Sequence, residues 1–225
     1  GNRRDDGILP GRQFRAMGPR LTVLVVAAAG FLSLGAIGEA RALTFKVDRH
    51  DGQRVLVAQG KIAQGDARTL RQWLRKDPDI QEILFNSPGG IFKEGIKIGR
   101  TLRDLDRVTR VPGKAMCASA CVWAFMGGVL RFADEDAKLG VHMATQINDK
   151  GTIGKVKDIL ARRSKIPIDT RMRQVITTIE QAAAKVVADK AEHLVRMGVS
   201  LRLLAPGLDT DQAKVYWLSH KELKS

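Results

Sequence analysis

Three short segments of this chain carry the residue types that acyl transfer needs. Ser119 is the one serine in the small-residue run 113–121, His142 follows the apolar residues 139–141, and Ser87-Pro88-Gly89-Gly90 joins an apolar run to a helical pattern. A serine hydroxyl can act as a nucleophile, and a histidine can take up its proton near neutral pH. Glycine-rich turns leave N–H groups free to hold a developing oxyanion. Together the segments predict a hydrolase site.

Each segment also has an ordinary structural interpretation. A serine among small residues is typical of close packing, and a Ser-Pro-Gly-Gly sequence is typical of many tight turns. A single histidine is more often a surface or core residue than a general base. The inference therefore depends on the order and spacing of the three segments.

The elements around these segments predict an α/β fold. Alternating apolar residues, the Asp51-Gly52 hairpin signal and helical spacings of three and four mark the elements. We expect strands at 43–48, 55–62, 83–85, 107–111, 129–132 and 139–142, and helices at 66–76 (capped by Asp66), 91–105, 117–126, 169–198 (capped by Asp169) and 219–223. Strands that alternate with helices indicate mainly parallel pairing. The long helix has the apolar stripe Met172, Val175, Ile176, Ile179, Ala183 and Val186.

The stretch from Ile83 to His142 resembles the Clp protease/crotonase superfamily. The resemblance rests on the Ser87–Gly90 turn, the segment from Gly113 to Cys121, the Gly127-Gly128 to Phe132 segment and the strand that ends in histidine. It is most similar to exported Clp-peptidase-like proteins in which cysteines flank the serine. The resemblance implies a ββα superhelix with a mainly parallel sheet and a C-terminal helical region, forming one domain over residues 43–225.

The resemblance also implies roles for individual residues. Ser119 matches the family nucleophile, and His142 matches the general base. Gly90 and Ala120 match the positions whose N–H groups form the oxyanion hole, and Gly89 shapes the turn.

The family's acidic residue has no direct match. Val215 stands at the corresponding position, and a valine cannot orient a histidine. Asp209 and Asp211 lie a few residues earlier and are the candidates, with Asp189 as an outside one. Lys138 allows a Ser–Lys pair as an alternative, although a solvated, ion-paired lysine is the simpler interpretation.

The cysteines Cys117 and Cys121 bracket the serine. A spacing of four residues and an oxidising compartment permit a disulfide between them, and two small buried apolar side chains are the alternative. A Cys-x₃-Cys pair without a second ligand pair does not indicate a metal site, so we expect neither a metal nor a cofactor.

The N-terminal segment has the pattern of a signal peptide. Residues 1–20 are polar and basic, residues 21–37 are apolar without a charge, and Ala40-Arg41-Ala42 follows. This pattern predicts export to the periplasm or another extracytoplasmic space, with cleavage after Ala42 and a biological start at Met17. The alternative is an uncleaved membrane anchor over residues 21–37.

Charge and composition bear on the partners. Lys+Arg 38 against Asp+Glu 24 gives +14, whereas aromatic residues make up only 5% of the chain. A base-stacking nucleic-acid surface needs more aromatic side chains, so we expect no nucleic-acid partner. A solvated basic surface is the simplest interpretation, with anionic lipids or cell-wall polymers as the acidic neighbours of an exported protein.

Three functions are consistent with these observations. The first is an exported serine hydrolase, a peptidase that acts on peptide or protein substrates. The second is a catalytically silent binding or scaffold protein on the same fold, and the third is a crotonase-like acyl-thioester enzyme. The resemblance implies a homo-oligomer. The tail from Val215 to Leu223 matches the family only up to its closing element, which indicates a truncated C-terminal end.

Overall fold

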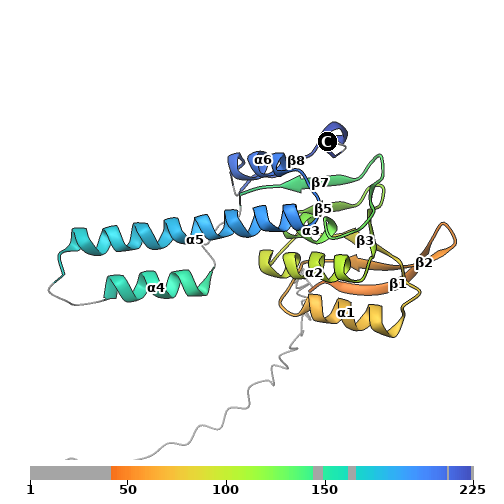
Figure 1. The fold of residues 1–225 in the computed structure, drawn as a ribbon, viewed down its shortest axis with the longest axis horizontal. Helices are drawn as coiled ribbons and strands as arrows, with labels where there is room; N and C mark the ends of the chain where they lie inside the picture. The colour runs from red at the N-terminus through yellow and green to blue at the C-terminus, as the bar shows by residue number, and fades with distance from the viewer. Residues whose placement is uncertain (1–41, 144–148, 162–165, 212, 224–225) are drawn as a thin grey trace, which may run out of the picture. The chain divides into compact units, whose positions relative to one another are not determined.

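The computed structural model describes residues 42–143, 149–161, 166–211 and 213–223 (Figure 1). The predicted signal segment therefore lies outside the described residues, apart from Ala42. No helix within the described ranges is long and apolar enough to cross a membrane. In chain order the elements are β1 Thr44–His50, β2 Gln53–Gln59, α1 Asp66–Lys76, β3 Glu82–Asn86, α2 Phe92–Asp104, β4 Val108–Val111, β5 Met116–Ala118, α3 Ala120–Phe125, β6 Arg131–Ala133, β7 Lys138–Val141, α4 Lys150–Ala161, α5 Ile168–Arg196, the 3₁₀ helix η1 Leu201–Leu203, α6 Leu204–Asp209, β8 Tyr216–Trp217 and α7 His220–Leu223.

Two sheets organise the strands. The larger sheet has the order β1-β2-β3-β4-β6, and only its β1–β2 pair is antiparallel. The smaller sheet has the order β5-β7-β8, in which β5 and β7 are parallel and β8 is antiparallel to β7. The predicted class, α/β with a mainly parallel sheet and a C-terminal helical region, is confirmed.

The predicted hairpin joins β1 to β2. Asp51 and Gly52 have φ angles of 48° and 78°, and His50 pairs with Gln53 across the turn. Two consecutive positive φ angles are what a two-residue hairpin turn requires, because this geometry follows the twist of the strands.

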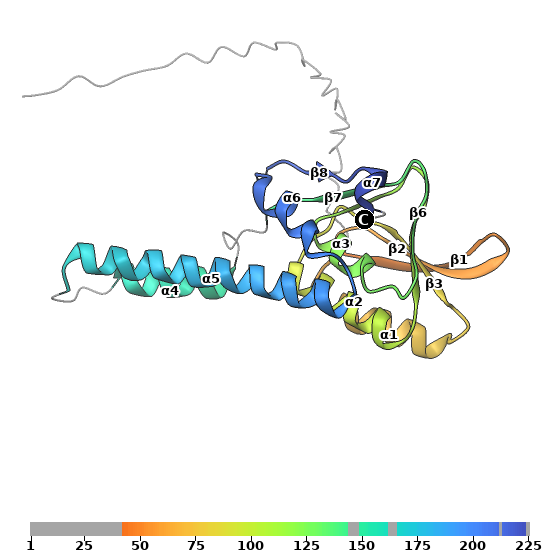
Figure 2. The same ribbon diagram turned by 45° about the horizontal axis from the view of Figure 1, so that its top comes forward.

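Helices α1 and α2 lie together along one face of the larger sheet (Figures 1 and 2). Their apolar stripes are closed from solvent, as Leu70, Ile98 and Leu102 show with 0% exposure. Helix α3 packs directly on α2 through glycines. A Cβ atom at Gly95 would lie 2.2 Å from the carbonyl oxygen of Ala120, so the two helix backbones touch there. This contact fixes the start of α3, and with it residue 119.

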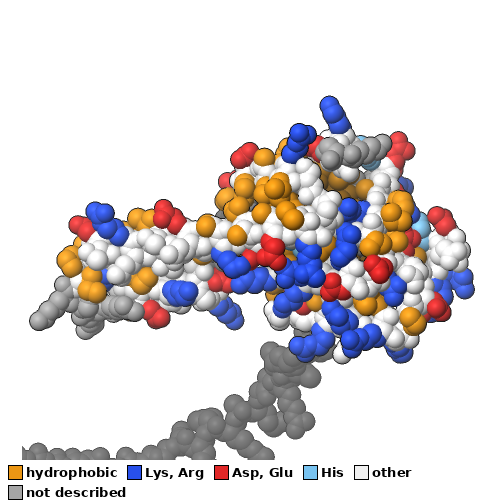
Figure 3. Space-filling model, in the orientation of Figure 1, with side chains coloured by type: hydrophobic (Ala, Val, Ile, Leu, Met, Phe, Trp, Pro, Cys, Tyr) orange, Lys and Arg blue, Asp and Glu red, His pale blue; other side chains and the backbone are white. Residues whose placement is uncertain are grey.

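The C-terminal part of α5 packs on α2 and α3. The ring Nε2 of His193 donates a hydrogen bond to the carbonyl oxygen of Trp123, at 2.8 Å. On the surface, two ion pairs join α2 to α5, Arg100–Glu192 at 2.8 Å and Arg196–Asp104 at 3.2 Å. Lys and Arg side chains gather around these helices (Figure 3).

Two predicted helix starts are wrong. Asp66 is the first residue of α1 and not its cap. Gly65 holds the cap position, and the Asp66 carboxylate accepts a hydrogen bond from the Ala63 N–H instead, at 2.6 Å. Helix α5 begins at Ile168 behind Pro167, which places Asp169 inside the first turn. Proline favours such positions because its φ angle already suits a helix.

The predicted helix over residues 117–126 is also wrong in its first part. Residues 116–118 form β5, which pairs with β7, and α3 begins only at Ala120. A run of small apolar residues has no periodicity that separates strand from helix, so tertiary pairing decides between them.

The long helix ends where the sequence predicts. Met197 is the last residue with helical geometry, and Gly198 follows with a φ of 62°. The predicted apolar stripe is only partly buried. Val175 and Val186 are closed from solvent, whereas Ile176 and Ile179 are 49% and 48% exposed. Helix α4 packs beside the N-terminal half of α5 (Figure 1).

Candidate functional site

Ser119 lies at the turn between β5 and α3. Its φ of 55° and ψ of −122° belong to a region that side-chain-bearing residues seldom adopt. Such a conformation costs about 1 to 3 kcal/mol and persists only where the surroundings enforce it. A sharp strand-to-helix turn of this kind lifts a serine hydroxyl away from the backbone of the elements on either side. The Ser119 side chain is half-buried.

Hydrogen bonds on both sides hold the strand that leads into this turn. The Ala118 N–H donates to the carbonyl oxygen of Ser87 at 3.0 Å, and the Ser119 N–H donates to that of Gly140 at 2.9 Å. The first bond ties β5 to the turn after β3, and the second ties it to β7. The position of Ser119 is therefore set by main-chain contacts with two other segments.

The turn at residues 87–90 lies directly against Ser119. The Ser87 hydroxyl accepts a hydrogen bond from the Gly89 N–H at 3.1 Å, which closes the turn on itself. A Cβ atom at residue 89 would lie 2.7 Å from the Cβ of Ser119 and 2.9 Å from the backbone nitrogen of Ala120. Because Gly89 also has a φ of 98°, only glycine fits at this position.

Two N–H groups, that of Ala120 directly after Ser119 and that of Gly90 directly after Gly89, have no acceptor within the described ranges. The Ile62 N–H donates to the carbonyl of Gly89, and the Ile91 N–H donates to the carbonyl of Ile62, so the Gly90 N–H between them is left over. The Ala120 N–H is the first of α3 and has no partner in its helix. A free amide after the serine and a second one from another loop are the donors that an oxyanion hole requires.

His142 follows β7 directly, as the sequence predicts. Because β5 and β7 are parallel and Ala118 pairs with Gly140, Ser119 and His142 both lie beyond the carboxyl ends of neighbouring strands. The His142 Nδ1 is 2.9 Å from the carbonyl oxygen of Met143. A carbonyl only accepts, so Nδ1 carries a proton, and in the neutral ring the lone pair is then on Nε2. In the described structure no hydrogen bond joins this ring to the Ser119 hydroxyl.

None of the candidate carboxylates binds the His142 ring within the described residues. Asp211 accepts a hydrogen bond from the Ala213 N–H at 2.7 Å, and Asp189 pairs with Lys185 on its own helix. Asp209 is exposed at the end of α6. The segment that carries Asp209 and Asp211 does lie close to His142, because the N–H of the next residue, Met143, donates to the carbonyl oxygen of Thr210 at 3.1 Å.

The strand register places Val215 relative to His142 and Lys138 relative to Ser119. Gly140 pairs with Trp217 and Val141 pairs with Tyr216, so continuing this register sets Val215 opposite His142. A valine at this position supplies no hydrogen bond to the ring. Lys138 begins β7 opposite Met116, three residues before the level of Ser119 or about 10 Å along the strand. The structure thus does not bring Lys138 to the serine.

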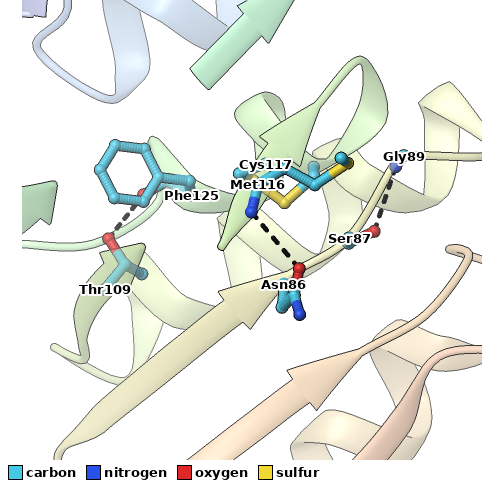
Figure 4. The surroundings of a disulfide bond; sticks show 8 residues. Asn86, Ser87, Gly89, Thr109, Met116, Cys117 and Phe125 are labelled. Carbon is cyan, nitrogen blue, oxygen red and sulfur yellow. Dashed lines mark hydrogen bonds between the residues drawn. A yellow bond between two sulfur atoms is a disulfide. The ribbon is translucent and has the colours of Figure 1, made fainter. Parts of the chain in front are cut away.

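Cys117 and Cys121 form a disulfide in the structure, with a Cα–Cα distance of 5.2 Å. Cys117 belongs to β5 and Cys121 to α3, so the bond spans the turn that carries Ser119 (Figure 4). Both cysteines are 0% exposed.

Two cavities lie near these elements. One of about 730 Å³ is lined by α3, β6 and the segments after α5, with apolar side chains and with Arg131, Arg202 and Glu222. The other, of about 260 Å³, lies at the end of β3 beside Asn86. Ser119 and His142 line neither of them. No cluster of three or more His, Cys, Asp or Glu side chains suited to a metal ion occurs in the part of the chain that the structure describes.

The buried pair Lys190 and His193 was not among the sequence candidates. Lys190 is 1% exposed and His193 0% exposed, both against Trp123 of α3. Burial lowers the pKa of Lys190 to about 8 and is the main cause that lowers the pKa of His193 to about 4. Spacings of four and three from Val186 place both residues on the buried stripe of α5. The helical spacing of the sequence therefore predicts that both residues are buried.

No protein-family model and no curated protein matches this chain. Among solved structures, the chain is similar to a point mutant of ClpP1 from Listeria monocytogenes, with 20% sequence identity and a TM-score of 0.44. The match covers 75% of this chain and 84% of that one.

Proposed function

We infer that this protein is a serine hydrolase that cleaves acyl bonds of peptide or protein substrates, with Ser119 as the nucleophile. One observation carries the proposal. Ser119 has the backbone geometry of a strand-to-helix nucleophile turn, Gly89 packs directly against it, and the N–H groups of Gly90 and Ala120 have no acceptor within the described residues. The sequence resemblance assigns the same three residues to the nucleophile and the oxyanion hole.

The proposed reaction uses groups of this chain alone. The Ser119 oxygen attacks the substrate carbonyl carbon while Nε2 of His142 takes the hydroxyl proton. The carbonyl oxygen becomes an oxyanion, which accepts hydrogen bonds from the Gly90 and Ala120 N–H groups. Collapse of this intermediate expels the amine, which receives the proton from the imidazolium. Water then attacks the acyl-serine with the same base, and the acid product and Ser119 are released.

The Met143 carbonyl takes the place of the acidic residue in this proposal. It accepts from Nδ1 at 2.9 Å and so selects the tautomer with a free Nε2. A neutral carbonyl stabilises the imidazolium less than a carboxylate does. Loss of the acid lowers the rate of a serine protease by about 10⁴-fold, so we expect slow turnover.

A silent binding protein is the second candidate, and one observation favours it. The His142 ring has no hydrogen bond or ion pair with a carboxylate or with the Ser119 hydroxyl within the described residues. Covalent labelling separates the two functions, because it needs a nucleophilic serine but no turnover.

The test uses a fluorophosphonate probe on the purified protein. We expect labelling of the wild type, none in Ser119→Ala, and a labelling rate at least about 100-fold lower in His142→Gln. Ser200→Ala, which removes an exposed serine elsewhere, is the matched control and should label like the wild type. Labelling absent from the wild type would support the silent protein. Binding of an acyl-CoA that survives Ser119→Ala would instead support the acyl-thioester enzyme.

The proposal includes export. The signal pattern of residues 1–42 predicts that a protein expressed with its leader begins at Leu43 after secretion. N-terminal sequencing of the secreted form tests this. Recovery in the membrane fraction with the leader attached would favour the anchor over residues 21–37.

A further inference from the structure

The disulfide joins the two elements on either side of Ser119. Cys117 precedes the serine by two residues on β5, and Cys121 follows it by two residues on α3. The closed ring therefore contains residues 117–121, with the strained residue 119 at its centre. Figure 4 shows the bond behind Met116, beside the Ser87–Gly89 segment.

The other contacts hold the two sides of the turn unequally. On the β5 side, the N–H groups of Ala118 and Ser119 donate to Ser87 and Gly140, at 3.0 and 2.9 Å. On the α3 side, the Ala120 N–H has no acceptor among the described residues, and the first hydrogen bond runs from the Val122 N–H to the Ser119 carbonyl, at 3.1 Å. Packing on α2 at Gly95 also holds the start of α3, and the disulfide adds a covalent tie between this first turn and β5.

The burial of both cysteines indicates that the disulfide has a structural role and is not a redox switch. Both cysteines are 0% exposed, and β5 lies between the turn after β3 and β7. A dissolved thiol needs access to a sulfur atom to exchange with a disulfide. The folded protein offers no such access at either cysteine.

We propose that Cys117 and Cys121 are positioning residues for Ser119: their disulfide holds the strained turn, so that the serine hydroxyl and the Ala120 N–H stay aligned with the Gly90 N–H. This rests on the proposed function. The physical reason is that a positive φ at a serine relaxes unless its surroundings enforce it. Without the bond, only non-covalent packing on α2 holds the start of α3, so a small rotation relative to β5 displaces nucleophile and donor together.

The experiment compares the wild type with Cys117→Ala/Cys121→Ala, at a temperature well below both melting temperatures. We expect the fluorophosphonate labelling rate to fall about 10- to 100-fold, the effect of misplacing a reacting group by about 1 Å. Leu70→Ala, a core substitution in α1 that also lowers the melting temperature, controls for lost stability and should keep the wild-type rate. If the double variant does not fold, Cys117→Val/Cys121→Ala refills the space of the sulfurs.

Hydrogen exchange gives a readout that does not depend on activity. The Ser119 amide should exchange about tenfold faster in the double variant, whereas the Val57 amide in β2 should be unchanged. Wild-type labelling and exchange rates in the double variant would overturn the proposal. If the wild type is not labelled at all, the proposed function fails, and the exchange at Ser119 still decides whether the disulfide holds the turn.

Discussion

At the residue scale, the site depends on the absence of a Cβ atom at Gly89. Gly89 brings its backbone against Ser119 and Ala120 so closely that a Cβ atom would lie 2.5 Å from the Ala118 carbonyl oxygen. Atoms of these types do not approach so closely, so any larger residue must push the two turns apart. The distance between the two proposed oxyanion donors is therefore tied to the size of residue 89.

Gly89→Ala tests this dependence. We expect the free energy of unfolding to fall by about 2 to 4 kcal/mol, from the clash and from the φ of 98°, and fluorophosphonate labelling to be lost. Gly113→Ala is the matched control, because nothing lies within 4 Å of its Cβ position. The control should change stability by no more than about 0.5 kcal/mol. Wild-type labelling and stability in Gly89→Ala would contradict the described packing.

Lys190 is a charge buried without an ion pair in the described structure. Its ammonium lies 5.4 Å from the centre of the Trp123 ring, and burial lowers its pKa to about 8. Since the unfolded chain holds this proton up to about pH 10.5, the lysine lowers folding stability most below pH 8 and least above pH 10.5.

Lys190→Met should therefore stabilise the protein. We expect a gain of about 1 to 3 kcal/mol at pH 7 by urea denaturation, and a smaller gain at pH 10.5. Lys185→Met is the control, because that side chain is 71% exposed and should contribute little. A loss of stability in Lys190→Met would mean that the contact with Trp123 outweighs the cost of burying the charge.

At the scale of elements, the docking of α5 depends on His193. Its Nε2 donates to the Trp123 carbonyl, while its Nδ1 is buried with no partner among the described residues. The ring is thus held neutral. Burial is the main cause of its pKa of about 4, and Arg100 and Arg196 lower it further.

This histidine predicts a loss of stability in acid. The folded protein binds the proton on His193 less tightly than the unfolded chain does. The contribution of the neutral ring to the free energy of unfolding is therefore complete above about pH 6.5 and is lost as the pH falls toward 4. The lowering of the His193 pKa from 6.5 to about 4 corresponds to about 3 kcal/mol of unfolding free energy. Between pH 6.5 and 4, wild-type urea stability should fall by about that much more than that of His193→Gln. Ile98→Val, which adds no titrating group, should follow the wild-type slope.

The elements near the site show what the sequence could predict. The hairpin at Asp51, the turn at residues 87–90 and the stop at Gly198 were predicted because glycine and aspartate signal backbone geometry locally. The strand β5 was missed because residues 116–118 are small and apolar, and only β7 beside them selects a strand. The positive φ of Ser119 has no signal in sequence, because it results from contacts with Ser87, Gly89 and Gly140.

At the scale of the whole molecule, α5 carries an apolar stripe that the described chain does not cover. Ile168, Met172, Ile176 and Ile179 follow each other at intervals of four, four and three residues and are 47–55% exposed. Water-facing isoleucines in such a row are typical of surfaces that meet a partner. We propose that a second copy of this chain covers them, in line with the homo-oligomer that the sequence resemblance implies.

Analytical ultracentrifugation of residues 43–225 tests self-association. The wild type should sediment as an oligomer, and Ile176→Glu should shift it toward the monomer, because an unpaired carboxylate is costly in an apolar interface. Gln174→Glu places the same charge on the opposite side of the helix and should leave the oligomer intact. A monomeric wild type, or an Ile176→Glu variant that still associates fully, would contradict this assignment.

Peptide mapping of the fluorophosphonate-treated protein by mass spectrometry tests the proposed chemistry most directly. The account predicts one adduct, on Ser119, in the peptide that also contains Cys117 and Cys121, and none when His142 is replaced by glutamine under the same brief exposure. An unmodified Ser119, or an adduct confined to another residue, would contradict the claim that this turn carries the nucleophile.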